Sequence, residues 1–396
     1  MQAHFVMSFR PNEVSGAIYI ETKQLNNMKK IIISMMAVAA LAACTKSEVQ
    51  YEPAGEIGFA PVARNITIAA LGVDDNVYPI AQNVGVWANY DGTVEHGATV
   101  DYATTFQTSY IADKQFTYHT DYSMWAGVTP YFWPTNGSLV FAGYSMTAPT
   151  TAGTNTVDVG ESRSYNFATD EMTITGYTQS LNPANTFDLL WFGRTAKSYN
   201  LRNQASGVPV VFSHALSWIT IQAKGQGTVV DSNNPWRITS LVINNVASKG
   251  DVTMVGSGAN AATWSNVVDA DEKNGNNFIT VFTGDKKLAA DEAVFETTKY
   301  GTVVIPQTPT AVDVTNPVAT LTVKYKYNTP AGVEIEETST VSLALTGVED
   351  QDGNPVTSWQ SGTHYIYTLT FSQSEIMIAP TVESWEVVVN QGVTVN

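Results

Sequence analysis

The chain has 396 residues, of which 44% are hydrophobic, 11% aromatic and only 14% charged. This apolar content suffices for sizeable cores and argues against an intrinsically disordered chain, and the length predicts two domains. The formal net charge of −16 disfavours binding to nucleic-acid phosphates and to anionic lipid surfaces. We therefore expect no nucleic-acid partner.

The N-terminal segment carries the pattern of a bacterial lipoprotein signal. Lys29-Lys30 precedes the apolar run 31–40, and Leu41-Ala42-Ala43-Cys44 follows it. Such a run is too short for a transmembrane helix and is typical of a secretory leader. The pattern predicts cleavage between Ala43 and Cys44 and acylation of the Cys44 thiol. At about 0.8 kcal/mol for each buried methylene, two or three acyl chains would anchor the mature chain in the outer membrane.

The lipoprotein signal also organises the start of the chain. Met28 gives a leader of ordinary length, so we interpret residues 1–27 as an upstream misreading of the start codon or a tail without a role, and residues 28–43 as the signal peptide. Residues 44–64 then form a lipidated pro-segment. Because Cys44 is the only cysteine, no disulfide is expected in the exported protein.

Beyond the leader, apolar residues recur with a period of two over many short segments, which predicts an all-β fold. Turns rich in Gly, Pro, Asn and Asp divide the segments and are typical of β-sandwiches. The polar stretch Thr195–Gly207 is the candidate linker between sandwiches over residues 65–205 and 206–396, and a long strand, Val208–Lys224, follows it. Further strands are expected at Asn65–Ala70, Val84–Ala88, Ser138–Tyr144, Met172–Tyr177, Asp188–Phe192, Arg237–Val246, Phe278–Thr283 and Thr302–Ile305.

A hairpin with a defined register is expected around the turn Asn328–Gly332. Apolar and polar residues alternate on both sides of this turn. A five-residue loop would place Tyr325 opposite Ile335 and Lys326 opposite Glu334 in an antiparallel ladder. The apolar face decides the fold, and the charge pairs help to fix the alignment.

Residue types that carry catalysis are scarce in this chain. No metalloprotease, serine-hydrolase or phosphate-loop motif is present. The segment from Asp269 to Thr280 departs from the calcium-loop pattern and is interpreted as a surface turn. We therefore expect no enzyme activity, no metal and no cofactor. Four histidines follow the leader, and no pair of them has metal-ligand spacing: His96, His119, His214 and His364.

Nine tryptophans leave a second class of function open. Aromatic platforms bind sugars, so a cell-surface glycan-binding lipoprotein is the alternative function. Two or more coplanar, exposed aromatic rings in one concave patch would favour it. Four of the tryptophans lie in or beside apolar strand patterns, where core packing is the expected use: Trp133, Trp191, Trp218 and Trp385.

Several segments spread over the mature chain together resemble the fimbrillins of Bacteroidetes, which are subunits of type V pili and include Mfa-like components. This resemblance implies two tandem transthyretin-like β-sandwich domains and a structural or adhesive role in a cell-surface pilus, without catalysis. Its partners would be other pilus subunits, the outer membrane through acylated Cys44, and a host or bacterial surface ligand. The matching segments are the lipobox with Glu56–Arg64, Tyr131–Pro134 with Leu139–Ala142, Val210–Leu216, Val304–Gln307, and Trp359–Tyr367 leading to Ile376–Ile378 and Trp385.

The resemblance also implies proteolytic processing. In this family, an arginine-specific protease cleaves the lipidated precursor, and the corresponding bond here is Arg64-Asn65. Arg64 is the only lysine or arginine between Lys46 and Lys114. Cleavage would remove the first strand and open a groove that accepts a donor strand from a neighbouring subunit.

Two segments are expected to take part in strand exchange. Ile57 and Phe59 would leave with the first strand. Pro61 allows two interpretations, because the removable strand is either Glu56–Ala60 alone or a longer strand that pairs on one edge. The C-terminal segment could supply a donor strand or a strand of its own sandwich, through Val387, Val389, Val393 and Val395.

Overall fold

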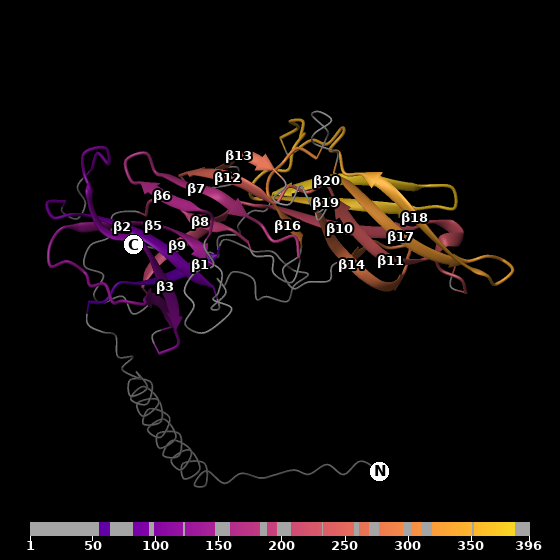
Figure 1. Cartoon of the computed structure of the whole chain (residues 1–396), viewed down its shortest axis with the longest axis horizontal. Helices are drawn as coiled ribbons and strands as arrows, with labels where there is room; N and C mark the ends of the chain where they lie inside the picture. Colours follow the sequence, from indigo (N-terminus) through magenta and orange to yellow (C-terminus); the bar gives the residue numbers. More distant parts are fainter. Residues whose placement is uncertain are drawn as a thin grey trace, which may run out of the picture. The chain divides into compact units, whose positions relative to one another are not determined.

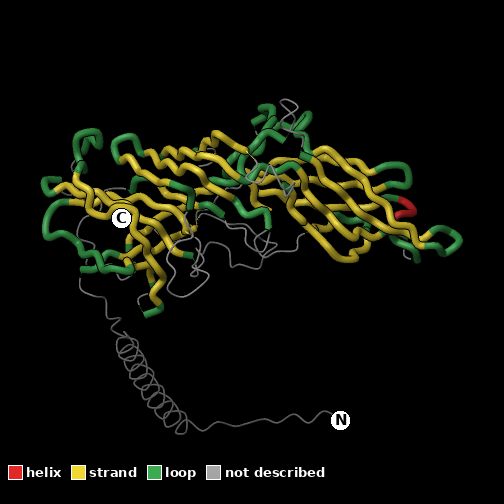
Figure 2. Tube along the Cα trace, in the orientation of Figure 1, coloured by secondary structure: helices red, strands yellow, loops and turns green. Residues whose placement is uncertain are grey.

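The computed structural model describes most of one compact unit, Pro53–Asn396, and every structural statement below concerns the described residues. Strands dominate them, and the helical element among them is a short 3₁₀ turn, η2 (Gly227–Val230) (Figure 2). The expected all-β fold is confirmed. In these ranges no helix has the length and apolar character to cross a bilayer. The described ranges are 55–63, 82–94, 99–121, 123–146, 159–182, 188–195, 207–231, 233–256, 261–268, 277–295, 302–309, 319–350 and 352–384.

Seven strands close into a barrel in the order β1-β4-β3-β2-β5-β8-β9. The first strand, β1, completes the ring because it pairs antiparallel with β4 on one side and parallel with β9 on the other. The strands of the barrel are β1 (Gly58–Ala63), β2 (Asn83–Asp91), β3 (Thr108–His119), β4 (Met124–Gly127), β5 (Ser138–Met146), β8 (Leu190–Phe192) and β9 (Val208–His214).

A bulge in β3 lets two large side chains face the barrel interior. Ile111 and Phe116 are both buried although they are five positions apart, a spacing that places residues on opposite faces of a regular strand. Asp113 lies between them with a φ of 46°, and the pairing of β2 with β3 shifts there. The extra residue at the bulge brings the Phe116 side chain back to the inner face of the strand.

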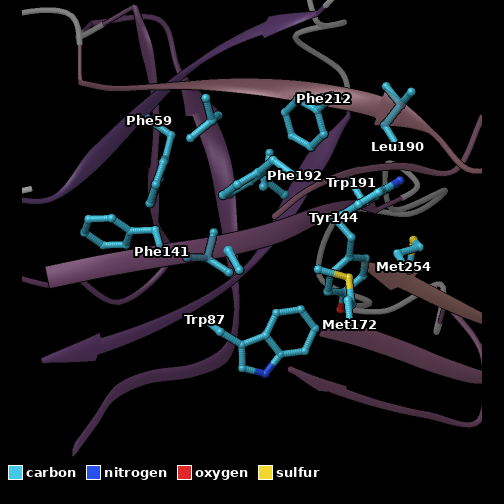
Figure 3. Packing of buried hydrophobic residues seen from close by; sticks show 14 of the residues in the cluster. Phe59, Trp87, Phe141, Tyr144, Met172, Leu190, Trp191, Phe192, Phe212 and Met254 are labelled. Carbon is cyan, nitrogen blue, oxygen red and sulfur yellow. The ribbon is translucent and has the colours of Figure 1, made fainter. Parts of the chain in front are cut away.

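A four-stranded sheet packs against the barrel and shares its core. It has the order β13-β12-β7-β6. Met172 of β7 and Met254 of β12 belong to the same buried cluster as Trp87 and Tyr144 of the barrel (Figure 3). This first core therefore combines a closed ring with one covering sheet. The strands of the sheet are β6 (Ser162–Asn166), β7 (Glu171–Thr178), β12 (Lys249–Val255) and β13 (Ala262–Val268).

A second core lies between two further sheets and forms a β-sandwich (Figure 1). Ile221 and Tyr367 come from one sheet and Leu241 and Val323 from the other, and all four are buried together. One sheet consists of β15 (Ala293–Phe295), β10 (Ser217–Gly225), β19 (Thr363–Phe371) and β20 (Ile376–Ser384), with β16 (Thr302–Val304) also paired to β10. The other consists of β14 (Phe278–Lys287), β11 (Arg237–Asn244), β17 (Thr320–Asn328) and β18 (Glu334–Ser342).

The expected long strand over 208–224 is wrong, because the segment forms two strands in different sheets. Strand β9 ends at His214 in the barrel, and β10 begins at Ser217 in the sandwich. The two residues between them bond elsewhere: the Ala215 N–H donates to the Leu189 carbonyl, and the Leu216 carbonyl accepts from the Gly362 N–H. The chain therefore passes from the barrel to the sandwich between His214 and Ser217.

The expected boundary between residues 205 and 206 does not coincide with the division between the two cores. Strand β9 lies in the first core, and β12 and β13 return to it because β12 pairs with β7, with Val252 opposite Ile174. Most of the candidate linker, 196–206, and the expected strand at 65–70 lie outside the described residues. The remaining expected strands overlap β2, β5, β7, β8, β11, β14 and β16.

The hairpin is present, but its expected register is wrong by two residues. Tyr325 lies opposite Glu337, and Lys326 opposite Glu336. A shift of two keeps each side chain on its expected face, so the apolar pattern alone could not exclude it. Lys326 still reaches Glu334 across a diagonal, with 3.5 Å between Nζ and Oε2.

The turn explains the shift. The first strand extends one residue further than expected, to Asn328, and the second begins one residue later, at Glu334, which pairs with Asn328. The Thr329 N–H then donates to the Val333 carbonyl at 2.8 Å, and the Gly332 N–H donates back to the Thr329 carbonyl at 2.9 Å. Gly332 has a φ of +79°, which glycine adopts without strain, and so the loop is tighter than five residues.

Candidate strand-exchange groove

Strand β1 has different pairing on its two edges. Along β4 only two positions pair, Gly58 with Ala126 and Phe59 with Trp125. Along β9 five consecutive positions pair, from Phe59 opposite Val208 to Ala63 opposite Phe212. The strand is thus held mainly by its parallel neighbour.

The residues just before β1 continue the pairing past the end of β4. The Ile57 N–H donates to the Tyr131 carbonyl, and the Trp133 N–H donates to the Gly55 carbonyl, both at 2.7 Å. Glu56 forms an isolated bridge with Phe132. Burial raises the pKa of the Glu56 carboxyl above its ordinary value, and the charge of His119 partly offsets this. The segment from Gly55 to Ala63 therefore occupies one continuous groove.

Phe59 fills the centre of this groove. Its side chain is fully buried and meets Phe116 and Phe141 edge-to-face, each with ring centroids 5.1 Å apart. Phe192 lies 6.3 Å away at a tilted angle (Figure 3). Ile57 is also fully buried. Both residues expected to leave with the first strand therefore belong to the barrel core.

Small residues bring the backbone of β1 close to its neighbours. A Cβ atom on Gly58 would lie 2.3 Å from the Met124 Sδ atom. On the other side, a Cβ atom on Gly207 would lie 2.9 Å from the carbonyl carbon and oxygen of Gly58. Sequence reasoning did not identify Met124 or Gly207, because their roles depend on pairing between segments that are far apart in the chain.

Of the two interpretations of Pro61, pairing on one edge is correct. Strand β1 continues through Pro61 to Ala63, with Pro61 opposite Val210 of β9. The pairing with β4 has already ended at Phe59. Proline has no N–H to donate, so it is tolerated in a strand where one edge has no partner strand.

The other residues expected to act in processing and exchange lie outside the described residues: Ala43, Cys44, Arg64, Asn65, Val387, Val389, Val393 and Val395. Strand β1 ends at Ala63, the residue before Arg64. A cut after Arg64 would therefore separate all of β1 from the rest of the barrel.

Comparison with known proteins decides the family. A model of the fimbrillin-like family matches residues 80–385. The chain belongs to the fimbrillin-like family. This confirms the resemblance inferred from the sequence and supports a role as a subunit of a cell-surface pilus. No curated protein matches the chain.

Solved structures similar to this fimbrillin-like chain are distant in sequence. A fimbrial protein from Bacteroides vulgatus is 15% identical with a TM-score of 0.46, and the match covers 84% of this chain and 99% of that one. A putative cell adhesion protein from Bacteroides uniformis is 14% identical with a TM-score of 0.40, covering 84% and 99%. The tip fimbrial protein Mfa3 from Porphyromonas gingivalis is 8% identical with a TM-score of 0.38, covering 83% and 100%.

Histidines in this fimbrillin-like chain have structural surroundings. His214 on β9 is buried, and its Nδ1 contacts a carboxylate oxygen of Asp188. His364 stacks on Trp218 with 3.6 Å between ring centroids, and burial lowers the pKa of its imidazole to about 4. Across the described ranges, no three His, Cys, Asp or Glu side chains converge as metal ligands.

Aromatic side chains of this fimbrillin-like chain serve mainly as packing. Every tryptophan and tyrosine in the described ranges is buried or half-buried, including Trp133, Trp191 and Trp218. Trp236 stacks against Tyr327 with 4.5 Å between ring centroids, so these faces are already covered. Trp385 lies outside the described residues. The platform that glycan binding would require is not seen in this part of the chain.

Proposed function

We propose that the protein is a structural or adhesive pilus subunit, exported as a lipoprotein precursor and assembled by proteolysis-triggered strand exchange, without catalysis of its own. One observation carries the proposal. The segment Gly55–Ala63, which contains the closing strand β1, contributes the fully buried Ile57 and Phe59, and it ends one residue before Arg64. A single cut can thus detach an essential part of the core.

Detachment of β1 has a large local cost. The facing edges of β4 and β9 lose their hydrogen-bond partners, and the ring opens between them. Burial of a side chain such as Ile57 or Phe59 contributes about 1.5–3 kcal/mol. A strand from another subunit that restores the ladder and fills these positions recovers this free energy, less the entropy lost on association.

The steps before exchange follow from the sequence signals. The leader directs export, and acylated Cys44 holds the precursor at the outer membrane. Cleavage of the Arg64-Asn65 bond then releases the subunit from its anchor and opens the groove in one event. Anchoring and assembly are therefore mutually exclusive states of one molecule, and other pilus subunits are the partners of the released state.

Digestion of the folded precursor with an arginine-specific protease tests this function. The Arg202→Lys background removes an arginine outside the described residues. The arginines within them are engaged with neighbouring side chains of the folded chain: Arg163, Arg194 and Arg237. We expect a product that begins at Asn65 by mass spectrometry and that polymerises by light scattering. Arg64→Ala in the same background should stay uncut and monomeric. Polymers formed equally well by Arg64→Ala would overturn the proposal.

A further inference from the structure

The loop between β4 and β5 presents large apolar side chains to solvent. Val128 is the most exposed large apolar side chain among the described residues, at 58%, and Phe132 is 51% exposed. Single exposed apolar residues are ordinary on a protein surface, but these two share one loop. We call residues 128–137 the aromatic loop, because Tyr131, Phe132 and Trp133 follow one another in it.

The aromatic loop carries no charge. The chain has a formal net charge of −16, yet no Asp, Glu, Lys, Arg or His occurs between Asp121 and Asp158. Glu56, which forms a bridge with Phe132, is half-buried, and burial raises the pKa of its carboxyl and so favours the uncharged form. The loop is therefore an uncharged, apolar part of an otherwise acidic surface.

The backbone around Phe132 is fixed while its ring projects outward. The Trp133 N–H donates to the Gly55 carbonyl at 2.7 Å, and the Tyr110 hydroxyl donates to the Phe132 carbonyl. Trp133 is only 6% exposed and occupies the inward position next to Phe132. The ring of Phe132 therefore has no place in the core and remains on the surface.

The aromatic loop lies where the pro-segment enters the barrel, because it pairs with Gly55. Gly55 is eleven positions after Cys44. A fully extended chain spans at most about 3.6 Å for each residue, so an acyl group on Cys44 keeps Gly55 within about 40 Å of the bilayer. This tether holds the loop at a high effective concentration beside the membrane, and a weak contact is then enough to dock it.

We propose that the aromatic loop is a membrane-docking surface of the lipoprotein precursor, and that Val128 and Phe132 insert at the boundary between the headgroups and the acyl chains of the bilayer. This inference rests on the acylation of Cys44, which belongs to the proposed function. Surface segments that bind membranes bury such side chains about 5–10 Å into this boundary.

Docking orients the precursor at the membrane. The end of the barrel at which Gly55 meets the aromatic loop faces the bilayer, and the segment runs from there to Ala63. At about 3.3 Å for each residue, this segment displaces Ala63 from Gly55 by about 26 Å. The cleavage bond Arg64-Asn65 thus follows the far end of the segment, away from the anchor. Cleavage removes the acyl group, and the weak contact of the loop then lets the subunit go.

Site-specific fluorescence tests the docking. Acylation consumes the thiol of Cys44, the only cysteine, so Phe132→Cys provides the sole free thiol of the acylated full chain for a nitrobenzoxadiazole dye. Val333→Cys is the matched control, because Val333 is 56% exposed and lies in the turn between β17 and β18 of the sandwich. In phosphatidylcholine vesicles that contain a nitroxide-labelled lipid, the dye at position 132 should be quenched at least about threefold more strongly than the dye at position 333. Equal quenching would overturn the docking and assign the exposed loop to a protein partner.

A charge placed on the loop should undock it. With the dye attached through Val128→Cys, Phe132→Asp should lower the quenching to the level of the Val333→Cys control, because a carboxylate is costly to bury in the boundary. Val333→Asp is the matched substitution and should leave the quenching at position 128 unchanged. Both side chains are exposed, so neither change disturbs a core. Full quenching in Phe132→Asp would contradict insertion of the loop.

Two further measurements separate this inference from the proposed function. Mass spectrometry of the purified precursor shows whether Cys44 is acylated, and vesicle flotation shows whether the chain is bound to the membrane. If an acylated, floating chain shows no excess quenching at position 132, the docking fails while the lipid anchor stands. If the chain carries no acyl group and does not float, the lipid anchor of the proposed function fails, and the docking that depends on it fails as well.

Discussion

Phe59 and Phe116 meet edge-to-face inside the barrel, with ring centroids 5.1 Å apart and an interplanar angle of 82°. They come from β1 and β3, which are not neighbours in the ring because β4 lies between them. The contact therefore joins strands through the core rather than through the ladder. The first strand is part of the barrel interior as well as of its wall.

Phe59→Ala should destabilise the uncleaved chain by about 3–5 kcal/mol, because it removes a fully buried ring and leaves a cavity. The matched control is Phe132→Ala. Phe132 lies in the segment that bridges to Glu56, but its side chain is 51% exposed, so its loss should cost less than about 0.5 kcal/mol. Urea unfolding followed by tryptophan fluorescence measures both. Equal effects would show that the groove is not filled as described.

His364 should make stability depend on pH. Burial lowers the pKa of its imidazole from 6.5 to about 4, so between these values the unfolded state binds more protons than the folded state. Stability is therefore complete above pH 6.5 and is lost as pH falls toward 4, by up to about 3 kcal/mol.

His364→Gln should remove this part of the pH dependence. Urea midpoints measured from pH 7 to pH 4 compare His364→Gln with the unmodified chain. A slope that persists unchanged in His364→Gln would assign the effect to other groups.

Gly332→Ala should destabilise the hairpin of β17 and β18 by about 1 kcal/mol, because a Cβ is strained at a φ of +79°. No atom lies within 4 Å of the added Cβ, so the effect comes from the backbone rather than from a clash. Ala331→Gly is the neighbouring control and should cost less. Thermal unfolding compares the variants. A neutral Gly332→Ala would contradict the tight turn that sets the register.

Cys44→Ser should abolish acylation, because a thioether requires sulfur. The acidic chain has little affinity of its own for an anionic surface, so the variant should be released or mislocalised. Metabolic labelling with a radioactive fatty acid, followed by fractionation, measures both effects. Label that still entered the variant would contradict the lipoprotein assignment.

Local patterns in the sequence predicted a large part of the fold. Alternation with a period of two located strands such as β2, β5 and β7, because the pattern arises within a single strand. Ile57 and Phe59 were instead identified through the resemblance to fimbrillins, and the structure shows that both side chains are buried. The strand pattern needs no knowledge of which segments become neighbours.

Features that depend on pairing between segments far apart in the sequence could not be predicted from local patterns. The apolar pattern runs through Ala215-Leu216 without interruption, so it concealed the change from β9 to β10. The return of β12 to β7 leaves no local signal either. The close approach of Gly58 to Met124 is a further example, since the two residues are 66 positions apart and meet only when β1 pairs with β4.

The N-terminal residue of subunits in polymers isolated from the cell surface distinguishes assembly after cleavage from assembly of the intact precursor. We expect assembled subunits to begin at Asn65, because the segment that carries Cys44 and β1 must leave before the groove can accept a donor. Unpolymerised precursor from the same cells should begin at acylated Cys44. Polymers whose subunits retained residues 44–64 would contradict the account, because the closing strand of the barrel would then still be in place.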